Sequence, residues 1–236
     1  MKKNRTALLM IGIMVELFFL LFLLGKYVLT DTVSTGSEGV IYGEKDGWGK
    51  GEQKQVALTF DDGPHPYYTE QLLDGLKERG VVATFFVTGE HALLHPEVIK
   101  RMQEEGHLIG NHTYTHMQLR NDNRAEFLEE LQLTNQVIKE ITGEDTLYVR
   151  PPYGSWDKSI EKELNMIPVL WTIDPLDWCS DDVSCVVRSV TEKVGENDII
   201  LMHDYYESTV TAALKIVDEL LEEGYTFVTV EEILFE

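Results

Sequence analysis

The stretch VALTFDDGP, Val56–Pro64, sets the pattern for the chain. Its first five residues are apolar or β-branched, which is typical of a short strand buried on both faces. Two aspartates, Asp61 and Asp62, follow this strand at once, and Gly63 and Pro64 then favour a sharp turn. Adjacent carboxylates repel each other, so the pair is either a solvated turn or a place where another group holds the charge.

Strand-like and helix-like segments alternate from Gln55 to the end of the chain. The segment 68–80 has apolar residues at helical spacing and ends in glycine, and 83–87 is again a short apolar run. About seven such units predict an α/β fold with a parallel sheet, in the form of a distorted, incomplete (β/α) barrel. An open doubly wound sheet is the alternative. Neither a G-x-G-x-x-G pattern nor a phosphate-loop lysine motif is present, so no nucleotide is expected.

The chain is strongly acidic, with 41 acidic and 20 basic side chains and a formal net charge of −21. A field of this sign repels phosphate backbones, so nucleic acid is not an expected partner. The two cysteines, Cys179 and Cys185, cannot build a disulfide framework or a cysteine-rich zinc module. They flank a short acidic loop, where either one small disulfide or two free thiols are expected.

The N-terminal residues are predicted to anchor the chain in the cell membrane. Ala7–Leu24 is an apolar run of 18 residues interrupted only by Glu16, and it follows a basic start. Because no small-x-small cleavage site follows it, we expect a retained single-pass anchor with its basic end in the cytoplasm. A cleaved signal peptide, giving a secreted protein, is the alternative. The expected segments are a cytoplasmic tail at 1–6, a transmembrane signal-anchor at 7–25, a linker at 26–54 and an extracytoplasmic catalytic domain at 55–236.

Polar side chains gather where the predicted strands end. In chain order they are Asp61, Asp62, His112, His116, Arg150, Asp174, Asp177 and His203. The carboxyl ends of parallel strands open onto one rim of a barrel, so these side chains are expected to meet. Two imidazoles and one carboxylate are the three protein ligands of a catalytic zinc site. One of the adjacent aspartates would then bind the metal while its neighbour acts as a base, but the spacing does not say which.

Five short motifs make the chain resemble the polysaccharide deacetylase family of carbohydrate esterases, from about Val56 to its end. The motifs are TFDDG (Thr59–Gly63), HTYTH (His112–His116), RPPYG (Arg150–Gly154), DPLDW (Asp174–Trp178) and LMH (Leu201–His203). The resemblance implies a distorted (β/α) barrel that removes acetyl groups from N-acetylated sugars with the help of a metal. It assigns one divalent ion, Zn²⁺ or alternatively Co²⁺ or another divalent ion, to Asp62, His112 and His116.

The resemblance also implies the acid, the base and the substrate contacts. It makes Asp61 the general base, held by Arg150, and it makes His203 the general acid with Asp174 as its carboxylate partner. The Tyr153 N–H would bind the oxyanion. The residues that would line the substrate pocket are Trp178, Leu201 and Pro152. The remaining histidines, expected to be structural or on the surface, are His65, His91, His95 and His107.

The motifs leave the exact glycan open. A tethered deacetylase outside the membrane faces the cell wall, so peptidoglycan is the expected polymer, with its N-acetylglucosamine unit preferred over its muramic unit. Chitin-type oligosaccharides, a secreted glucosamine polymer and O-acetylated xylan are alternatives. Trp156 and Tyr205 are candidate sugar-stacking walls or ordinary packing residues. The alternative of another class is a membrane-tethered glycan-binding protein whose site is a catalytic relict.

Overall fold

The computed structural model describes residues 54–235 of the chain. The predicted tail at 1–6, the predicted anchor at 7–25 and all but the last residue of the predicted linker lie outside the described residues. Between residues 54 and 235, no helix combines the length and the apolar surface that crossing a bilayer requires. The described part coincides with the region where strands and helices are expected to alternate.

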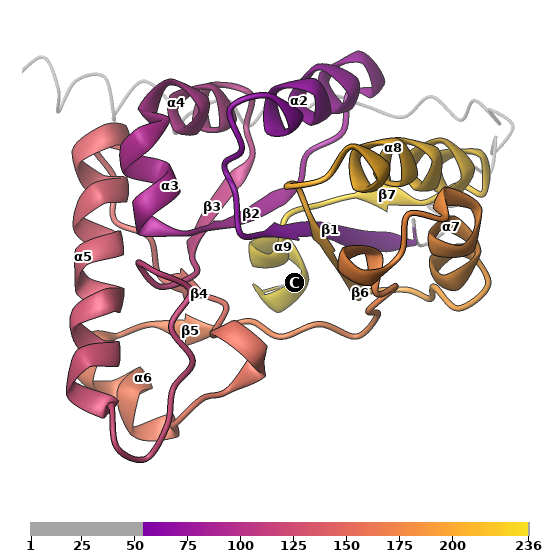
Figure 1. Cartoon of the computed structure of the whole chain (residues 1–236). Helices are drawn as coiled ribbons and strands as arrows, with labels where there is room; N and C mark the ends of the chain where they lie inside the picture. Colours follow the sequence, from indigo (N-terminus) through magenta and orange to yellow (C-terminus); the bar gives the residue numbers. More distant parts are fainter. Residues whose placement is uncertain (1–53, 236) are drawn as a thin grey trace, which may run out of the picture. The chain divides into compact units, whose positions relative to one another are not determined.

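A curled sheet of seven parallel strands forms the centre of the fold (Figure 1). The strands are β1 (Gln55–Asp61), β2 (Thr84–Val87), β3 (Leu108–Asn111), β4 (Tyr148–Val149), β5 (Ile167–Pro168), β6 (Asp198–His203) and β7 (Thr226–Phe227). Their order is β5-β4-β3-β2-β1-β6, and β7 pairs with the start of β1. Parallel neighbours throughout are what the alternating strands and helices of the sequence predict.

The sheet curls until its two edges meet along a single seam. Ile173, beyond the end of β5, forms an isolated parallel bridge with Ile200 of β6, and Thr172 donates a backbone hydrogen bond to Ile199. No continuous ladder closes this seam within the described residues. The prediction of a distorted, incomplete (β/α) barrel is confirmed; beyond the two residues of β5, the edge strand continues only as this bridge.

Helices follow the strands and pack around the sheet (Figure 1). They are α2 (Tyr68–Arg79), α3 (Gly89–Leu94), α4 (Pro96–Glu104), α5 (Arg124–Thr142), α6 (Lys158–Leu164), α7 (Val183–Thr191), α8 (Glu207–Glu222) and α9 (Val230–Phe235), with 3₁₀ turns η1 (Pro152–Gly154) and η2 (Asp177–Cys179). In α2, Leu72, Leu73 and Leu76 are fully buried, and Gly80 ends the helix with a φ of 63°. The short helix α3 is absent from the sequence prediction because its six residues show no helical period.

The two cysteines, in η2 and α7, are exposed and unpaired, so this structure has the free thiols.

The central strand β1 explains the motif that follows it. It lies between β2 and β6, and every residue of Val56–Asp61 is buried. The register places Asp61 beside His203, the last residue of β6. His112 directly follows β3 and Arg150 directly follows β4. The carboxyl ends of the strands therefore bring the predicted polar residues to one edge of the sheet.

Candidate active site

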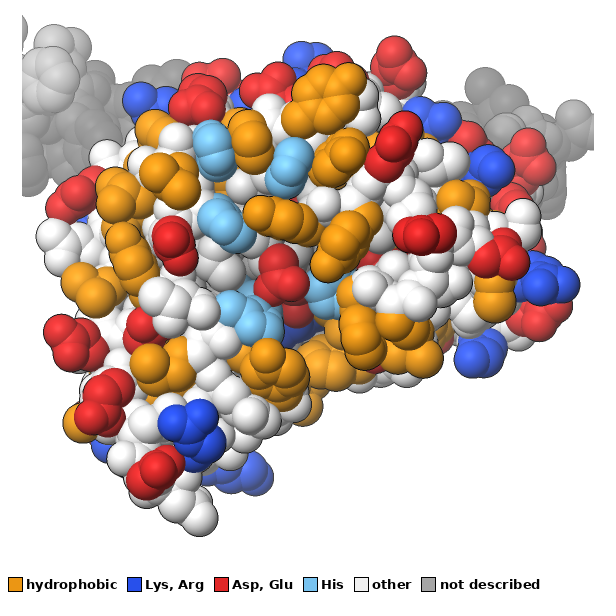
Figure 2. Space-filling view, in the orientation of Figure 1, with side chains coloured by type: hydrophobic (Ala, Val, Ile, Leu, Met, Phe, Trp, Pro, Cys, Tyr) orange, Lys and Arg blue, Asp and Glu red, His pale blue; other side chains and the backbone are white. Residues whose placement is uncertain are grey.

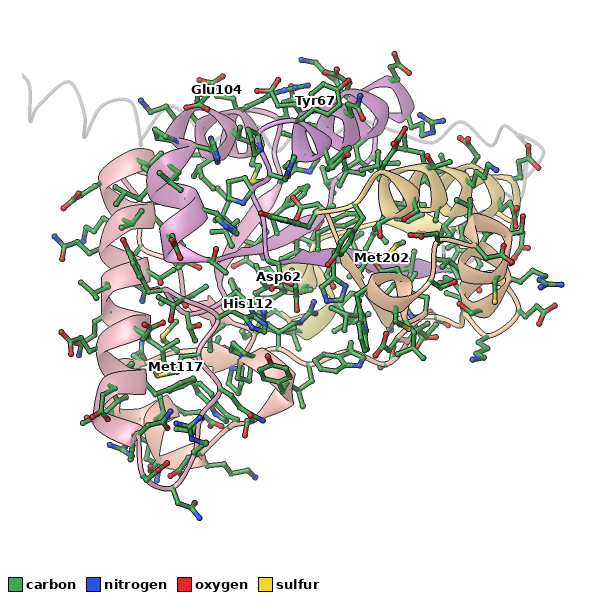
Figure 3. All side chains as sticks on the ribbon, viewed as in Figure 1. Asp62, Tyr67, Glu104, His112, Met117 and Met202 are labelled. Carbon is green, nitrogen blue, oxygen red and sulfur yellow. The ribbon has the colours of Figure 1, made fainter. Side chains whose placement is uncertain are left out.

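Asp62, His112 and His116 form the centre of the candidate site. The Nε2 atoms of both histidines lie 3.4 Å from Oδ1 of Asp62. One ligand atom from each residue lies within 4.8 Å of the other two. In Figure 3 the labelled side chains of Asp62 and His112 lie close together, beyond the end of β1. The sequence predicts these residues as one cluster, and the structure brings them together.

The backbone of this cluster adopts conformations that are uncommon for residues other than glycine. The φ angle is 73° at Asp62, 63° at Thr113 and 58° at His116. A left-handed conformation costs a residue with a side chain about 1–2 kcal/mol, and such residues gather at functional sites. The turns after β1 and β3 are therefore strained, and this backbone geometry brings the side chains of Asp62 and His116 together.

His112 is held in one orientation. Its side chain is buried, and its Nδ1 lies 2.6 Å from the backbone oxygen of Arg150. Because a carbonyl oxygen can only accept, Nδ1 carries a hydrogen and donates it, so in the neutral ring Nε2 is the nitrogen without a hydrogen, and it faces Asp62. This tautomer is the one a metal ligand needs, and a hydrogen bond behind the imidazole is the usual way to fix it.

The cluster fits a divalent metal ion. Burial alone raises the pKa of Asp62, but the contact with His112 and the charges of His112 and His116 outweigh burial and lower this pKa to about 2. At 3.4 Å the two imidazoles stand beyond good hydrogen-bond distance, so Oδ1 of Asp62 is buried without a hydrogen-bond partner among the described residues. In a tetrahedral site with metal–ligand bonds of about 2.0–2.1 Å, ligand atoms lie about 3.3–3.4 Å apart. The two distances from Oδ1 of Asp62 to the imidazoles match this separation.

Asp61 lies beside the cluster and is held from behind by Arg150. Nη1 of Arg150 donates to Oδ1 of Asp61 at 2.9 Å, and both side chains are buried. Arg150 also donates to Oγ1 of Thr59 at 2.6 Å and to two backbone oxygens beyond β5. Burial lowers the pKa of Arg150, and the Asp61 carboxylate opposes that shift. The second oxygen of Asp61, Oδ2, lies 3.7 Å from Nε2 of His112 and so faces the candidate metal cluster.

His203 is paired with Asp177 rather than with the predicted Asp174. Nδ1 of His203 lies 3.0 Å from Oδ1 of Asp177, and the His203 backbone N–H donates to Oδ2 at 2.9 Å. Thr209 donates its hydroxyl to the same Oδ2 at 2.8 Å. Burial alone lowers the pKa of His203, but Asp177 outweighs burial and raises this pKa to about 9. The imidazole is therefore protonated at neutral pH.

The prediction of Asp174 as the partner is wrong because the DPLDW loop turns between its two aspartates. Oδ1 of Asp174 accepts the backbone N–H of Leu176 at 2.8 Å, so this carboxylate stabilises the loop itself. Leu176 has a φ of 57°, and the η2 turn that follows buries Asp177. Both aspartates follow the same predicted strand, so their spacing gives no signal that separates them.

The four residues predicted to contact substrate differ in exposure. Tyr153 is 68% exposed and Trp178 is 55% exposed, whereas Leu201 and Pro152 are buried. Tyr153 belongs to η1, has a φ of 59° and places its ring 5.0 Å from the ring of His116. Trp178 belongs to η2, which also carries Asp177, and Leu201 belongs to β6, which also carries His203. All four therefore lie on the strand ends and loops that build the site.

Aromatic and histidine rings form a wall beside the cluster of Asp62, His112 and His116. Nδ1 of His91, in α3, donates to the backbone oxygen of Asp62 at 2.7 Å. The His91 ring stacks on Tyr205 at 5.5 Å, and Tyr205 meets His65 edge-on at 4.9 Å. Figure 2 shows histidine, acidic and apolar side chains around a hollow on this face. His91 and His65 were expected to be structural or on the surface, and the structure places both at the site.

Asp204 is a buried carboxyl group that sequence reasoning missed. It follows His203, is fully buried, and accepts a short hydrogen bond from the hydroxyl of Thr69. Burial raises the pKa of Asp204 to about 7, although the hydrogen bond from Thr69 opposes the shift. A Cβ at Gly63 would lie 2.4 Å from both carboxylate oxygens. Glycine is therefore required where this carboxyl group packs against the turn that carries Asp62.

Comparison with known proteins extends these observations. A family model described as polysaccharide deacetylase matches residues 49–169. Peptidoglycan-N-acetylmuramic acid deacetylase PdaC of Bacillus subtilis is 39% identical over 181 residues, which cover 77% of this chain and 39% of that protein. A peptidoglycan-N-acetylglucosamine deacetylase of Bacillus cereus is 39% identical over 190 residues, which cover 77% of this chain and 89% of that protein.

A solved structure points the same way. The structure of PdaC from Bacillus subtilis matches with a TM-score of 0.75 at 38% sequence identity, covering 78% of this chain and 91% of that one. The chain spans about two fifths of the full length of the first curated relatives. The motifs, the curled parallel sheet and the matched relatives agree, and the chain belongs to the polysaccharide deacetylase family.

Proposed function

We propose that the chain is a metal-dependent N-deacetylase of a cell-wall glycan, which hydrolyses the linear amide C–N bond of an N-acetyl group. The observation that carries the proposal is the pairing of Asp61 with His203 at the ends of β1 and β6. Each has a buried partner, Arg150 or Asp177, and Asp62 of the metal-binding cluster directly follows Asp61. A base, an acid and a metal site are therefore available to one acetamide group.

The proposed metal ligands are Asp62, His112 and His116. Two imidazoles and one carboxylate suit Zn²⁺ best, and Co²⁺ or another divalent ion is the alternative. When bound, such an ion polarises a carbonyl oxygen and lowers the pKa of water at its open position. The hydrogen bond from Nδ1 of His112 to the Arg150 carbonyl keeps Nε2 available for the ion.

Asp61 is the proposed general base. Arg150 binds one of its oxygens at 2.9 Å, and this contact fixes the carboxylate plane. The other oxygen faces His112 and can accept a proton from water beside the metal-binding cluster. Arg150 also donates to Thr59 and to two backbone oxygens, so its position is fixed as well.

His203 is the proposed general acid. Its Nδ1–H is directed to Asp177, so Nε2–H is the proton that it can give to the departing nitrogen. An amine is a poor leaving group unless it is protonated, and the raised pKa of His203 supplies that proton at neutral pH. The Tyr153 backbone N–H is proposed to bind the oxyanion, and Trp178, Leu201 and Pro152 to line the acetyl pocket.

The proposed substrate is peptidoglycan, and its N-acetylglucosamine unit is the first choice. Support comes from relatives that are named as peptidoglycan-N-acetylglucosamine and peptidoglycan-N-acetylmuramic acid deacetylases. A tail at 1–6, an anchor at 7–25 and a linker at 26–54 would hold the catalytic domain at 55–236 next to the wall. This topology remains a proposal from the apolar N-terminal sequence.

Acetate release from purified wall glycan tests the proposal. The purified full chain should release acetate, lose this activity on dialysis against a chelator, and regain it with added Zn²⁺. Metal content should follow activity and approach one ion per chain. A protein that binds the glycan and one metal ion, yet releases no acetate from peptidoglycan or from N-acetylglucosamine oligosaccharides, would instead be the non-catalytic glycan-binding alternative.

A further inference from the structure

A groove lies between two loops that both begin at residues of the candidate site. One loop follows His116 and leads to α5, and the other follows Tyr153 and leads to α6. The hydroxyl of Ser155 donates to the backbone oxygen of Leu119 at 3.1 Å and joins the loops. The groove has a volume of about 570 Å³, which is within the range of small-ligand sites.

The two loops that line the groove leave the candidate site next to each other. The rings of His116 and Tyr153, where the two loops begin, lie 5.0 Å apart. Trp156 forms a half-buried apolar wall of the groove, held by a hydrogen bond from Nε1 to Glu161 at 3.1 Å and by packing on Phe127. A glycan whose reactive sugar lies at the metal-binding cluster would direct a neighbouring sugar toward this groove.

The lining of the groove is positive in an acidic protein. Arg120, Arg124 and Lys158 line it, and Asp157 is the only carboxylate among its described lining residues. Oδ1 of Asp157 accepts the backbone N–H of Ser159 at 2.8 Å, so this carboxylate caps α6. The whole chain carries 41 acidic against 20 basic side chains, so three cations in one groove run against its overall charge. Figure 2 shows Lys and Arg side chains at the lower left of the face that carries the hollow.

These cations remain available to a ligand. Arg120 pairs with Asp122 at 3.3 Å and Arg124 with Glu163 at 2.7 Å, and both carboxylates lie outside the groove lining. Exposed pairs of this kind contribute about 0–1 kcal/mol each, so a bound anion can compete for the guanidinium groups. Lys158 has no ion pair with any other described residue.

We infer that this groove is a subsite for a carboxylate-bearing sugar unit next to the N-acetyl sugar that reacts. The inference rests on the proposed deacetylase function and adds the class of glycan. The carboxylate would bind Arg120, Arg124 and Lys158, and the apolar side of the unit would pack on Trp156. It can be the lactyl carboxylate of a muramic unit or a carboxylate of a peptide attached to that unit. Neutral chitin-type glycans would lack this contact.

The test compares three glycans with the same reactive sugar. They are a neutral N-acetylglucosamine oligosaccharide, a peptide-free wall glycan with lactyl carboxylates, and the same wall glycan with its peptides. The variant Arg120→Gln/Arg124→Gln/Lys158→Gln should raise KM for a carboxylate-bearing glycan by about tenfold to a hundredfold, since each of the three exposed charge pairs contributes a factor of about two to five. Its kcat, and its activity on the neutral oligosaccharide, should stay close to wild type. The arm that shows the effect identifies the lactyl or the peptide carboxylate as the ligand.

Arg188→Gln is the matched control, because Arg188 is exposed on α7 and does not line the groove. Direct binding of the three glycans, measured by calorimetry, gives a readout that does not need turnover. Equal affinity of wild type and triple variant for every glycan would overturn the inference, even if acetate is released normally. Preferential binding of a carboxylate-bearing glycan without acetate release would support the subsite and contradict the proposed function.

Discussion

The carboxyl group of Asp204 packs directly against Gly63, at the turn that carries Asp62. A Cβ at Gly63 would lie 2.4 Å from both Asp204 oxygens. Asp204 is fully buried and accepts a hydrogen bond from the hydroxyl of Thr69, which holds its carboxyl group against Gly63. The contact joins the residue after His203 to the residue after Asp62, and so it links the end of β6 to the turn after β1.

Gly63→Ala should therefore destabilise the protein by about 1–3 kcal/mol, the usual cost of overpacking a buried site. In an Asp204→Ala background the same substitution should cost much less, because the clashing carboxyl group is gone. Urea unfolding of the wild type, both single variants and the double variant gives the coupling free energy. Additive effects of the two substitutions would show that the contact does not limit residue 63.

Arg150→Met should destabilise the protein far more than the loss of an exposed arginine. Arg150 is fully buried. Its removal leaves the buried Asp61 carboxylate without its ion-pair partner. Breaking a buried pair in this way costs about 3–5 kcal/mol. The control is Arg79→Gln, which breaks the exposed pair with Asp218 and should cost at most about 1 kcal/mol. Chemical unfolding measures both, and equal losses would contradict the prediction.

The polar strand ends could be predicted from the sequence because parallel strands share one direction. Asp61, His112, Arg150 and His203 follow or end separate strands, and the sheet brings their side chains together without any detailed knowledge of the loops. The different positions of the two adjacent aspartates could not be predicted in this way. They depend on the turn at Asp62, whose φ of 73° directs this side chain toward the histidines. The spacing of residues in the sequence does not reveal that backbone angle.

The partners that prediction missed or mistook are set by loops and short helices. His91 lies in α3, which has too few residues for a periodic signal, and yet it donates to the Asp62 carbonyl. Asp177 and Asp174 stand three residues apart in one loop, and only the turn at Leu176 decides which of them is buried. Such contacts depend on the packing of distant segments, which no local pattern encodes.

Asp177→Asn should weaken the acid and shift the pH dependence of the reaction. The pKa of His203 is raised to about 9, so the imidazolium needed as acid is present below that pH and is lost above it. Without the Asp177 charge this pKa falls toward its ordinary value of about 6.5. The alkaline limb of kcat/KM should move from about pH 9 to lower pH, and the rate at pH 8 should fall about thirtyfold, because only about 3% of the imidazole then carries the proton.

Asp174→Asn is the matched control, since an asparagine oxygen can still accept the Leu176 N–H. Its pH–rate profile should overlay that of the wild type. The His203–Asp177 pair also contributes to the free energy of unfolding in a pH-dependent way. This contribution is fully present below about pH 6.5 and is lost as pH rises through about 9. If Asp174→Asn shifts the alkaline limb and Asp177→Asn does not, the partner assignment from the structure is wrong.

The adjacent aspartates should separate metal binding from proton transfer. Asp61→Asn leaves the proposed ligands Asp62, His112 and His116 in place, and its amide oxygen can still accept from Arg150. It should keep the metal but lose about 10²–10⁴ in rate, because an amide cannot take the proton. Asp62→Asn should bind the metal more weakly, since a neutral amide oxygen is a poorer ligand than a carboxylate.

Bound metal and acetate release, both followed through a metal titration, distinguish the two variants. Excess metal should restore part of the activity of Asp62→Asn and none of the activity of Asp61→Asn, because only the first has lost affinity. His203→Ala should behave like Asp61→Asn, since His203 pairs with Asp177 and is not one of the proposed ligands. Loss of the metal from Asp61→Asn together with its retention by Asp62→Asn would reverse the two roles. Near-normal rates in all three variants would place the chemistry elsewhere, because neither a missing base nor a missing acid can then limit the reaction.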